Sequence, residues 1–379
     1  MRENFKEILN EYNTHAKDTA TKISKEERVF LQEEAGNLIE KSSKKRGNSA
    51  EVQAEILNIQ KSKQNIMRKM HKQFRKLDNG GVIESLEKTR IVSFDKNSGK
   101  FYYSNSKDTI IFLDISDILT DGEWGITYGF DNSVPKSVQK KYILSEAKRE
   151  IANKLDEQII LDESTSPTTD TFKQKAYLEI KKSKDNQDKF EGFLAEKMIK
   201  GLLAKLSIEG ADFEIEEADV YQDVEQKIDF LIRRKNHNRA VGVTEDDKII
   251  GVQFTLNKAK EDFKKKQVER SRRNLKGKSK RKHEREVDDI MLVVMPVEKL
   301  SSTYRKWAED KKPGGPENLW DINMKYQILK GVLNGLVDEE EIRKLLYKDI
   351  KTDLELDLFA KQSELEYVKK ELDRRENNQ

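Results

Sequence analysis

The chain lacks several residue types and patterns, and each absence excludes a class of chemistry. It contains no cysteine in 379 residues, which excludes disulfides, thiolate zinc sites, iron–sulfur clusters and cysteine nucleophiles. No phosphate-loop motif occurs, and the four histidines have no metal-ligand spacing. The N-terminus is charged where a secretory signal would be apolar, and no apolar run is long enough to cross a bilayer. We therefore expect a cytoplasmic protein without a membrane span.

Proline is also scarce, whereas charged residues are abundant. The five prolines favour long helices joined by polar connections. Lys and Arg number 73 and Asp and Glu number 70, so the net charge is only +3 although 38% of the residues are charged. Local clusters of charge therefore say more about partners than the total does.

Changes in the hydrophobic period divide the chain into six regions. Residues 1–79 predict a helical hairpin. β-branched and aromatic runs over 80–134 predict a small β module, with a β-hairpin around the turn at residues 95–100 and further strands at 109–113 and 125–128. Residues 135–170 predict a helix and a polar linker, Ser164–Thr169, where we expect a domain boundary. Residues 171–300 predict an α/β domain, and 301–350 a helical extension. Residues 351–379 predict a C-terminal helix whose leucine spacing fits either a homodimeric coiled coil or a single packed helix.

Two strand-like runs each contain a polar residue where a buried strand would be apolar. Asp229 interrupts the run at residues 227–232, and Gln253 interrupts the run at residues 249–255. A buried carboxylate is unfavourable unless a partner or a metal compensates its charge. Asp229 is therefore the first candidate for a residue that carries chemistry.

The elements around these runs predict the order helix, three strands, helix and strand over residues 187–300. This order, with an acid on the second strand and a polar residue on the third, resembles the PD-(D/E)XK nuclease superfamily. The resemblance implies an α/β domain with a restriction-endonuclease-like αβββαβ core, within a chain that is α+β as a whole. It also implies Mg²⁺ or Mn²⁺ as the cofactor and phosphodiester hydrolysis in nucleic acid, DNA rather than RNA, as the activity.

The same resemblance suggests two helix acids. Glu196, in the pattern Gly192-x-x-x-Glu196, matches the Holliday-junction-resolvase-like branch, and Glu191 after Phe190 matches the Mrr-like branch. Glu196 is preferred. Either glutamate could also be a solvated residue on a helix surface.

On the strands, Asp229 matches the second-strand acid, and Gln253 matches a variant in which glutamine replaces the third-strand acid. The resemblance thus implies Glu196, Asp229 and Gln253 as metal ligands. Asp223, six residues before Asp229, is either a further acid of the site or a turn residue.

The catalytic lysine of the family is missing from its usual position. Thr255 lies two residues after Gln253, where the family has this lysine, and a hydroxyl cannot supply its positive charge. Lys258 is the alternative, because the lysine lies on a neighbouring element in some members. The degenerate pattern leaves open a catalytically inactive nucleic-acid-binding protein, and also a helical scaffold protein.

Positive side chains dominate residues 264–285, which we call the basic belt. Such a density of charge suits a phosphate backbone, and the absence of aromatic residues predicts binding that does not depend on sequence. The alternative is a solvated lysine-rich surface. The candidate nucleic-acid-binding residues are Lys264, Lys265, Lys266, Arg270, Arg272, Arg273, Lys278, Lys280, Arg281 and Lys282.

Overall fold

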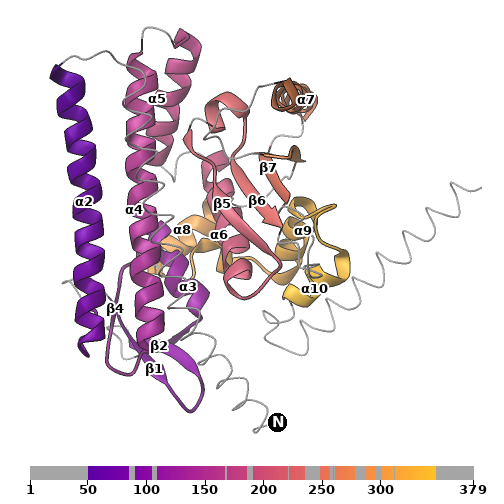
Figure 1. The fold of residues 1–379 in the computed structure, drawn as a ribbon. Helices are drawn as coiled ribbons and strands as arrows, with labels where there is room; N and C mark the ends of the chain where they lie inside the picture. The colour runs from indigo at the N-terminus through magenta and orange to yellow at the C-terminus, as the bar shows by residue number, and fades with distance from the viewer. Residues whose placement is uncertain are drawn as a thin grey trace, which may run out of the picture.

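The computed structural model describes residues 50–84, 90–104, 109–166, 169–185, 191–220, 222–234, 248–256, 259, 261–277, 287–294, 300–310 and 312–346. Two four-stranded sheets and the helices around them confirm a mixed α and β architecture (Figure 1). Of the predicted helical hairpin only the part from residue 50 is described, and the predicted C-terminal helix lies outside these ranges. Within them, no helix is long and apolar enough to cross a membrane.

The first sheet has the strand order β3-β2-β1-β4. β1 (Arg90–Asp95) and β2 (Lys100–Ser104) form the predicted antiparallel hairpin, followed by β3 (Ile110–Leu113). The strand predicted from residue 125 is wrong in its start, because Gly125 ends η1 (Asp121–Trp124) with a φ of 72°. β4 (Tyr128–Phe130) begins later and pairs parallel to β1. The short helix α3 (Ile115–Thr120) was not predicted.

Three long helices pack side by side, in their order along the chain (Figure 1). They are α2 (Ala50–Asp78), α4 (Lys136–Thr165) and α5 (Thr171–Asp185). Ile151 and Leu155 of α4 belong to a buried cluster with Met70 of α2 and Tyr177 of α5. Residues 164 and 165 are therefore the end of a helix and not a linker, while the domain boundary expected at 164–169 stays a prediction.

The second sheet and its two helices follow the predicted order of helix, three strands, helix and strand. The series is α6 (Glu191–Ile208), β5 (Phe213–Glu217), β6 (Phe230–Arg234), β7 (Lys248–Thr255), α7 (Glu261–Gly277) and β8 (Asp289–Val294). A π-helical turn, η3 (Gln222–Gln226), precedes β6. The strand order is β5-β6-β7-β8, with antiparallel pairing except between β7 and β8, which are parallel.

Helices cover both faces of this second sheet. Leu203 of α6 is fully buried in one cluster with Phe230 and Val252 of the strands. Val268 of α7 is buried in another cluster with Leu231. The alternation of side chains along a strand thus places α6 on one face of the sheet and α7 on the other.

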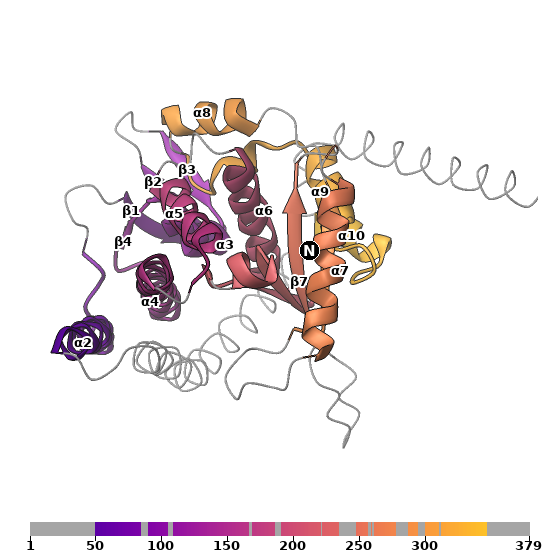
Figure 2. The same cartoon turned by 90° about the horizontal axis from the view of Figure 1, so that it is seen from above.

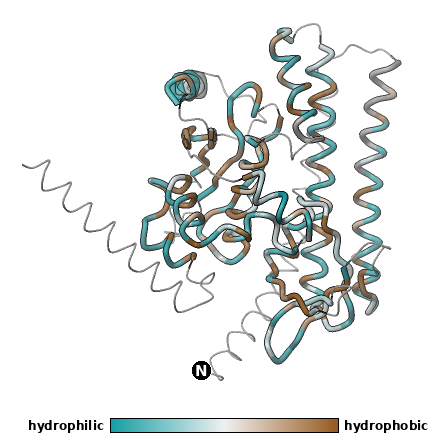
Figure 3. Tube along the Cα trace, turned by 180° about the vertical axis from the view of Figure 1, so that it is seen from behind, coloured by the Kyte–Doolittle hydropathy of each residue, from teal (hydrophilic) through white to brown (hydrophobic). Residues whose placement is uncertain are grey.

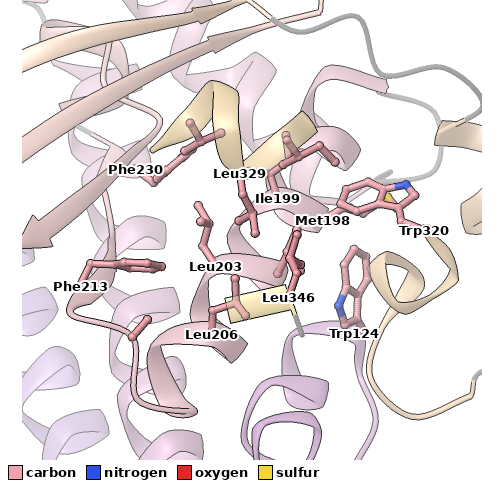
Figure 4. Packing of buried hydrophobic residues seen from close by; sticks show 14 of the residues in the cluster. Trp124, Met198, Ile199, Leu203, Leu206, Phe213, Phe230, Trp320, Leu329 and Leu346 are labelled. Atoms are coloured by element: carbon pink, nitrogen blue, oxygen red, sulfur yellow. The ribbon is translucent and has the colours of Figure 1, made fainter. Parts of the chain in front are cut away.

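One apolar core joins the two sheets through α6, which lies between them in Figure 2. Trp124, from the turn after α3, packs in this core with Met198 and Ile199 of α6 (Figure 4). The core continues into the C-terminal elements α8 (Leu300–Asp310), η5 (Pro316–Leu319), α9 (Ile322–Val332) and α10 (Glu339–Leu346). The described residues from 300 to 346 thus form helices joined by turns, whereas a separate helical extension over residues 301–350 stays a prediction.

A buried polar network lies at the junction between the first sheet, α6 and η5. The carboxylate of Asp121 is fully buried, and it accepts hydrogen bonds from the Tyr128 hydroxyl and, at 2.7 Å, from the Gly314 N–H. Burial and the charge of Asp117 raise the pKa of Asp121 to about 7, although the hydrogen bond from Tyr128 and the charge of Lys205 oppose this shift.

Lys205 of α6 is the positive charge of this network. Its ammonium lies 3.3 Å from a carboxylate oxygen of Asp117 and 3.1 Å from one of Glu317. It also donates hydrogen bonds to the Gly314 carbonyl and, at 3.0 Å, to the Asn318 side chain. The network thus joins α3, α6 and η5, which lie far apart in the sequence.

Candidate functional site

Asp229 lies directly before β6, where its main chain and its side chain both bind β7. Its N–H donates to the Val252 carbonyl at 2.8 Å, and its carboxylate accepts a hydrogen bond from the Phe254 N–H at 2.6 Å. Asp229 is therefore fixed to the two residues on either side of Gln253. This contact places Asp229 beside Gln253, so the two polar residues that interrupt the apolar runs lie next to each other.

Gln253 is almost completely buried, at 1% exposure, on the face of β7 that α7 covers. Val252 and Phe254 point to the α6 face, so Gln253 and Thr255 alternate to the opposite one. The amide oxygen of Gln253 accepts no hydrogen bond from the part of the chain that the structure describes. A buried acceptor of this kind calls for a ligand, a water or an ion.

Two further carboxylates act on Asp229. Burial raises the pKa of Asp229 well above its usual range, and the negative charges of Glu196 on α6 and Asp223 on η3 raise it further. Burial and the charge of Glu196 likewise raise the pKa of Asp223 to about 7. We call Glu196, Asp223 and Asp229 the acid cluster, because the charge of Glu196 raises the pKa of both aspartates and the charge of Asp223 raises that of Asp229.

Three lysines accompany the acid cluster, and the sequence patterns did not assign any of them to it. Lys264 of α7 lowers the pKa of both Asp223 and Asp229. Lys200 of α6 pairs with Glu196 at 3.1 Å. Lys227 lies between the two aspartates in the sequence, and its charge lowers the pKa of Asp223.

A signal for two of these lysines was present in the sequence. Glu196 and Lys200 have the i, i+4 spacing of a helical ion pair. Lys264 lies four residues before Val268, and in a helix this spacing places it on the same face as that buried valine. Glu196 of α6 and Lys264 of α7 thus both affect the pKa of Asp229, although their helices cover opposite faces of the sheet.

The other predicted site residues divide into two groups. Glu191 is exposed, and its carboxylate accepts a hydrogen bond from the Ser301 hydroxyl at 2.8 Å, away from the acid cluster. Thr255 is buried, with 8% exposure, two residues after Gln253 on the same face. Lys258 lies outside the described residues. Of the two helix acids, Glu196 is therefore the one that acts on Asp229.

The basic belt is not one uniform surface. Lys264 faces the acid cluster, whereas Lys265 pairs with Glu261 at 2.7 Å. Arg272 pairs with Asp289 at 2.8 Å, so this arginine connects α7 with β8. Figure 3 shows α7 as a mainly hydrophilic helix. The belt residues of α7 with exposed side chains are Lys265, Lys266, Arg270 and Arg273, whereas Lys278, Lys280, Arg281 and Lys282 lie outside the described residues.

The candidate metal ligands are oxygen donors, which is the donor type that Mg²⁺ prefers. Within the described ranges, no group of three or more His, Cys, Asp or Glu side chains could hold a metal ion. Mg²⁺ usually keeps several waters and uses only one or two carboxylates with the phosphates of its substrate. Glu196, Asp229 and the unpartnered amide oxygen of Gln253 are donors of that kind, and a cation would relieve the repulsion between the acids.

No family model, curated protein or solved structure matches the chain. The case for a function therefore depends on the geometry of this cluster.

Proposed function

We propose that the chain is a Mg²⁺- or Mn²⁺-dependent nuclease whose second sheet is the αβββαβ core of the PD-(D/E)XK type. The observation that carries the proposal is the position of Asp229, which is bound to β7 on either side of Gln253 and whose pKa is raised by the charge of Glu196. The strand order and the parallel β7–β8 pair, with α7 as the crossover between them, support the same core.

Each residue has a role that follows from its chemistry. Glu196, Asp229 and Gln253 would hold the metal ion through oxygen atoms, and Asp223 would accept hydrogen bonds from waters around it. A bound Mg²⁺ supplies Lewis-acid polarisation of the phosphate and lowers the pKa of a bound water. In the hydrolysis, a water oxygen forms a new bond to phosphorus while the bond from phosphorus to the leaving oxygen breaks. The leaving oxygen takes up a proton, and the proton of the attacking water passes to solvent or to a nearby carboxylate.

The exposed belt residues of α7 supply the substrate contact in this proposal. A positive helix beside the acid cluster attracts a phosphate backbone that the carboxylates alone would repel. Phosphate contacts position a nucleic acid without reading its sequence. We therefore propose binding to nucleic acid, DNA rather than RNA, without strong sequence preference, and a cytoplasmic location fits such a substrate.

The change Asp229→Asn tests the catalytic part of the proposal. It removes the negative charge and keeps the volume, so metal-dependent cleavage of single- and double-stranded DNA should be abolished while the protein still folds. Asp262→Asn is the matched control, since Asp262 is an exposed acid near the start of α7. Cleavage that survives Asp229→Asn, or that is lost equally in Asp262→Asn, would contradict the assignment.

A second function, nucleic-acid binding without catalysis, is favoured by one observation. Thr255 and Gln253 are neutral where an active member of the family has a lysine and an acid, and Gln253 carries no charge to attract a metal. This alternative predicts that nucleic acid binds while neither Mg²⁺ nor Mn²⁺ supports cleavage.

A further inference from the structure

Lys227 has a backbone conformation that lysine rarely adopts. It is the one non-glycine residue with a positive φ among the described residues, at 60°. It follows the π-helical turn η3, and the next N–H, that of Ile228, donates back to the Gln222 carbonyl at 3.2 Å. Helices commonly end on such a left-handed residue with a returning hydrogen bond, and glycine is the usual occupant because it has no Cβ.

The left-handed backbone at position 227 therefore favours glycine, and it does not explain why a lysine is present. A left-handed conformation is unfavourable for a lysine, so the fold would be at least as stable without the side chain. Strained residues and π-helical turns are both concentrated at functional sites. The function of this side chain therefore depends on the groups that surround its ammonium.

The surroundings of Lys227 are the acid cluster itself. Asp223, Glu225 and Asp229 all act on its charge, as does Lys264. The side chain is half-buried. Within the described part of the chain, no carboxylate oxygen forms a contact ion pair with Lys227.

The other two lysines are less suited to contact a substrate. The ammonium of Lys200 is held between two carboxylates, at 3.1 Å from Glu196 and 3.0 Å from Glu217. Lys264 lies on α7, with its stem on the face that packs against the sheet. Lys227 is instead carried by the segment that also carries Asp223 and Asp229, so its ammonium moves with these acids.

We propose that Lys227 is the catalytic lysine of this site and replaces the amine that Thr255 lacks. Its ammonium contacts a non-bridging oxygen of the scissile phosphate and stabilises the negative charge that develops there. This inference rests on the proposed function, since it assigns a residue to the same hydrolysis. It also gives a reason for a lysine in a position that suits glycine.

The test compares Lys227→Gly with Lys227→Arg in the full chain. Glycine relaxes the backbone and removes the amine, whereas arginine keeps a positive charge at the same strained position. The change Lys96→Gly, in the exposed turn between β1 and β2, is the control for the loss of a lysine elsewhere. For each variant we would measure cleavage of single- and double-stranded DNA with Mg²⁺ and Mn²⁺, and the midpoint of thermal unfolding without metal.

We expect Lys227→Gly to cleave roughly 10²- to 10³-fold more slowly than wild type, in line with the loss of one group that stabilises a developing charge. Its unfolding midpoint should equal or exceed that of wild type. Lys227→Arg should retain a substantial part of the activity, and Lys96→Gly all of it.

Three results would overturn the role of Lys227 alone, provided that wild type is active. These are a Lys227→Gly variant as active as wild type, a Lys227→Arg variant no better than Lys227→Gly, and a loss of activity in Lys227→Gly with a clearly lower unfolding midpoint. The last would show that the side chain supports the fold. Wild-type protein that cleaves neither substrate with either metal would overturn the proposed function, and the role of Lys227 with it.

Discussion

Asp121 should make the protein less stable as the pH rises, and Asp121→Asn should remove this dependence. In the folded state burial raises the pKa of Asp121 from 3.8 to about 7. The folded chain therefore holds the proton more tightly than the unfolded chain does. The stability from this group is fully present at low pH and is lost as the pH rises towards about 7.

The size of the effect follows from the two pKa values. One pKa unit corresponds to 1.36 kcal/mol, so a shift of about three units corresponds to a total of about 4 kcal/mol. Of this total, about 2.5 kcal/mol should be lost between pH 5 and pH 8. Asparagine carries no charge, and it can accept from the Gly314 N–H and donate to the Tyr128 hydroxyl, so both hydrogen-bonding groups keep a partner.

The assay is urea denaturation of wild type and Asp121→Asn at pH 5, 6, 7 and 8 and constant ionic strength. The difference in free energy of unfolding, variant minus wild type, should increase by about 2.5 kcal/mol over this range. Other titrating groups cancel in this difference. A difference that stays constant with pH, or an Asp121→Asn variant that loses stability at pH 8, would refute the reasoning.

Asp131→Asn is the control of opposite sign. Burial alone would raise the pKa of Asp131, but hydrogen bonds from the hydroxyls of Ser133 and Ser93 outweigh it and lower the pKa. The stability from Asp131 is therefore present above the pKa of the unfolded chain and is lost as the pH falls. Asp131→Asn should consequently destabilise the protein at pH 8, where Asp121→Asn should stabilise it.

Two further predictions concern the nuclease proposal. Thr255→Lys restores the lysine of the family pattern, so a DNA cleavage assay with Mg²⁺ should show a higher rate than wild type; no cleavage by either protein would favour binding without catalysis. Neutralising Lys278, Lys280, Arg281 and Lys282 together should weaken binding to all sequences alike and reduce the slope of log affinity against log salt by roughly 0.7 to 0.9 per lost phosphate contact. An unchanged slope in a salt titration would show that these residues are a solvated surface.

Local sequence patterns were enough to predict much of the second sheet. The apolar runs around Asp229 and Gln253 predicted β6 and β7, and these two polar residues lie opposite one another where the strands meet. The β1–β2 hairpin was equally clear, because a turn with Gly99 separates two aromatic runs. In these cases the signal lies within a few residues of the element that it predicts.

What the sequence could not predict depends on contacts between distant residues. Lys205 and Glu317 meet across more than one hundred positions, and neither residue is surrounded by a pattern that requires the other. Lys227 reads as one lysine among many, because its positive φ depends on how η3 leads into β6. For Lys264 the spacing to Val268 indicates one face of a helix, but only the structure shows that this face packs against the sheet.

Helix α6 connects the acid cluster with the buried network around Asp121. Around its middle it carries Glu196 of the acid cluster and Lys200, which pairs with Glu196, and near its end it carries Lys205, which binds Glu317 of η5. A helix held at one end by a buried ion pair cannot shift without leaving that charge unpaired, which is strongly unfavourable. The first sheet and η5 therefore fix the position of Glu196 relative to Asp229, although neither contributes a residue to the acid cluster. On this basis, the β module at residues 80–134 serves the site by holding α6 in place.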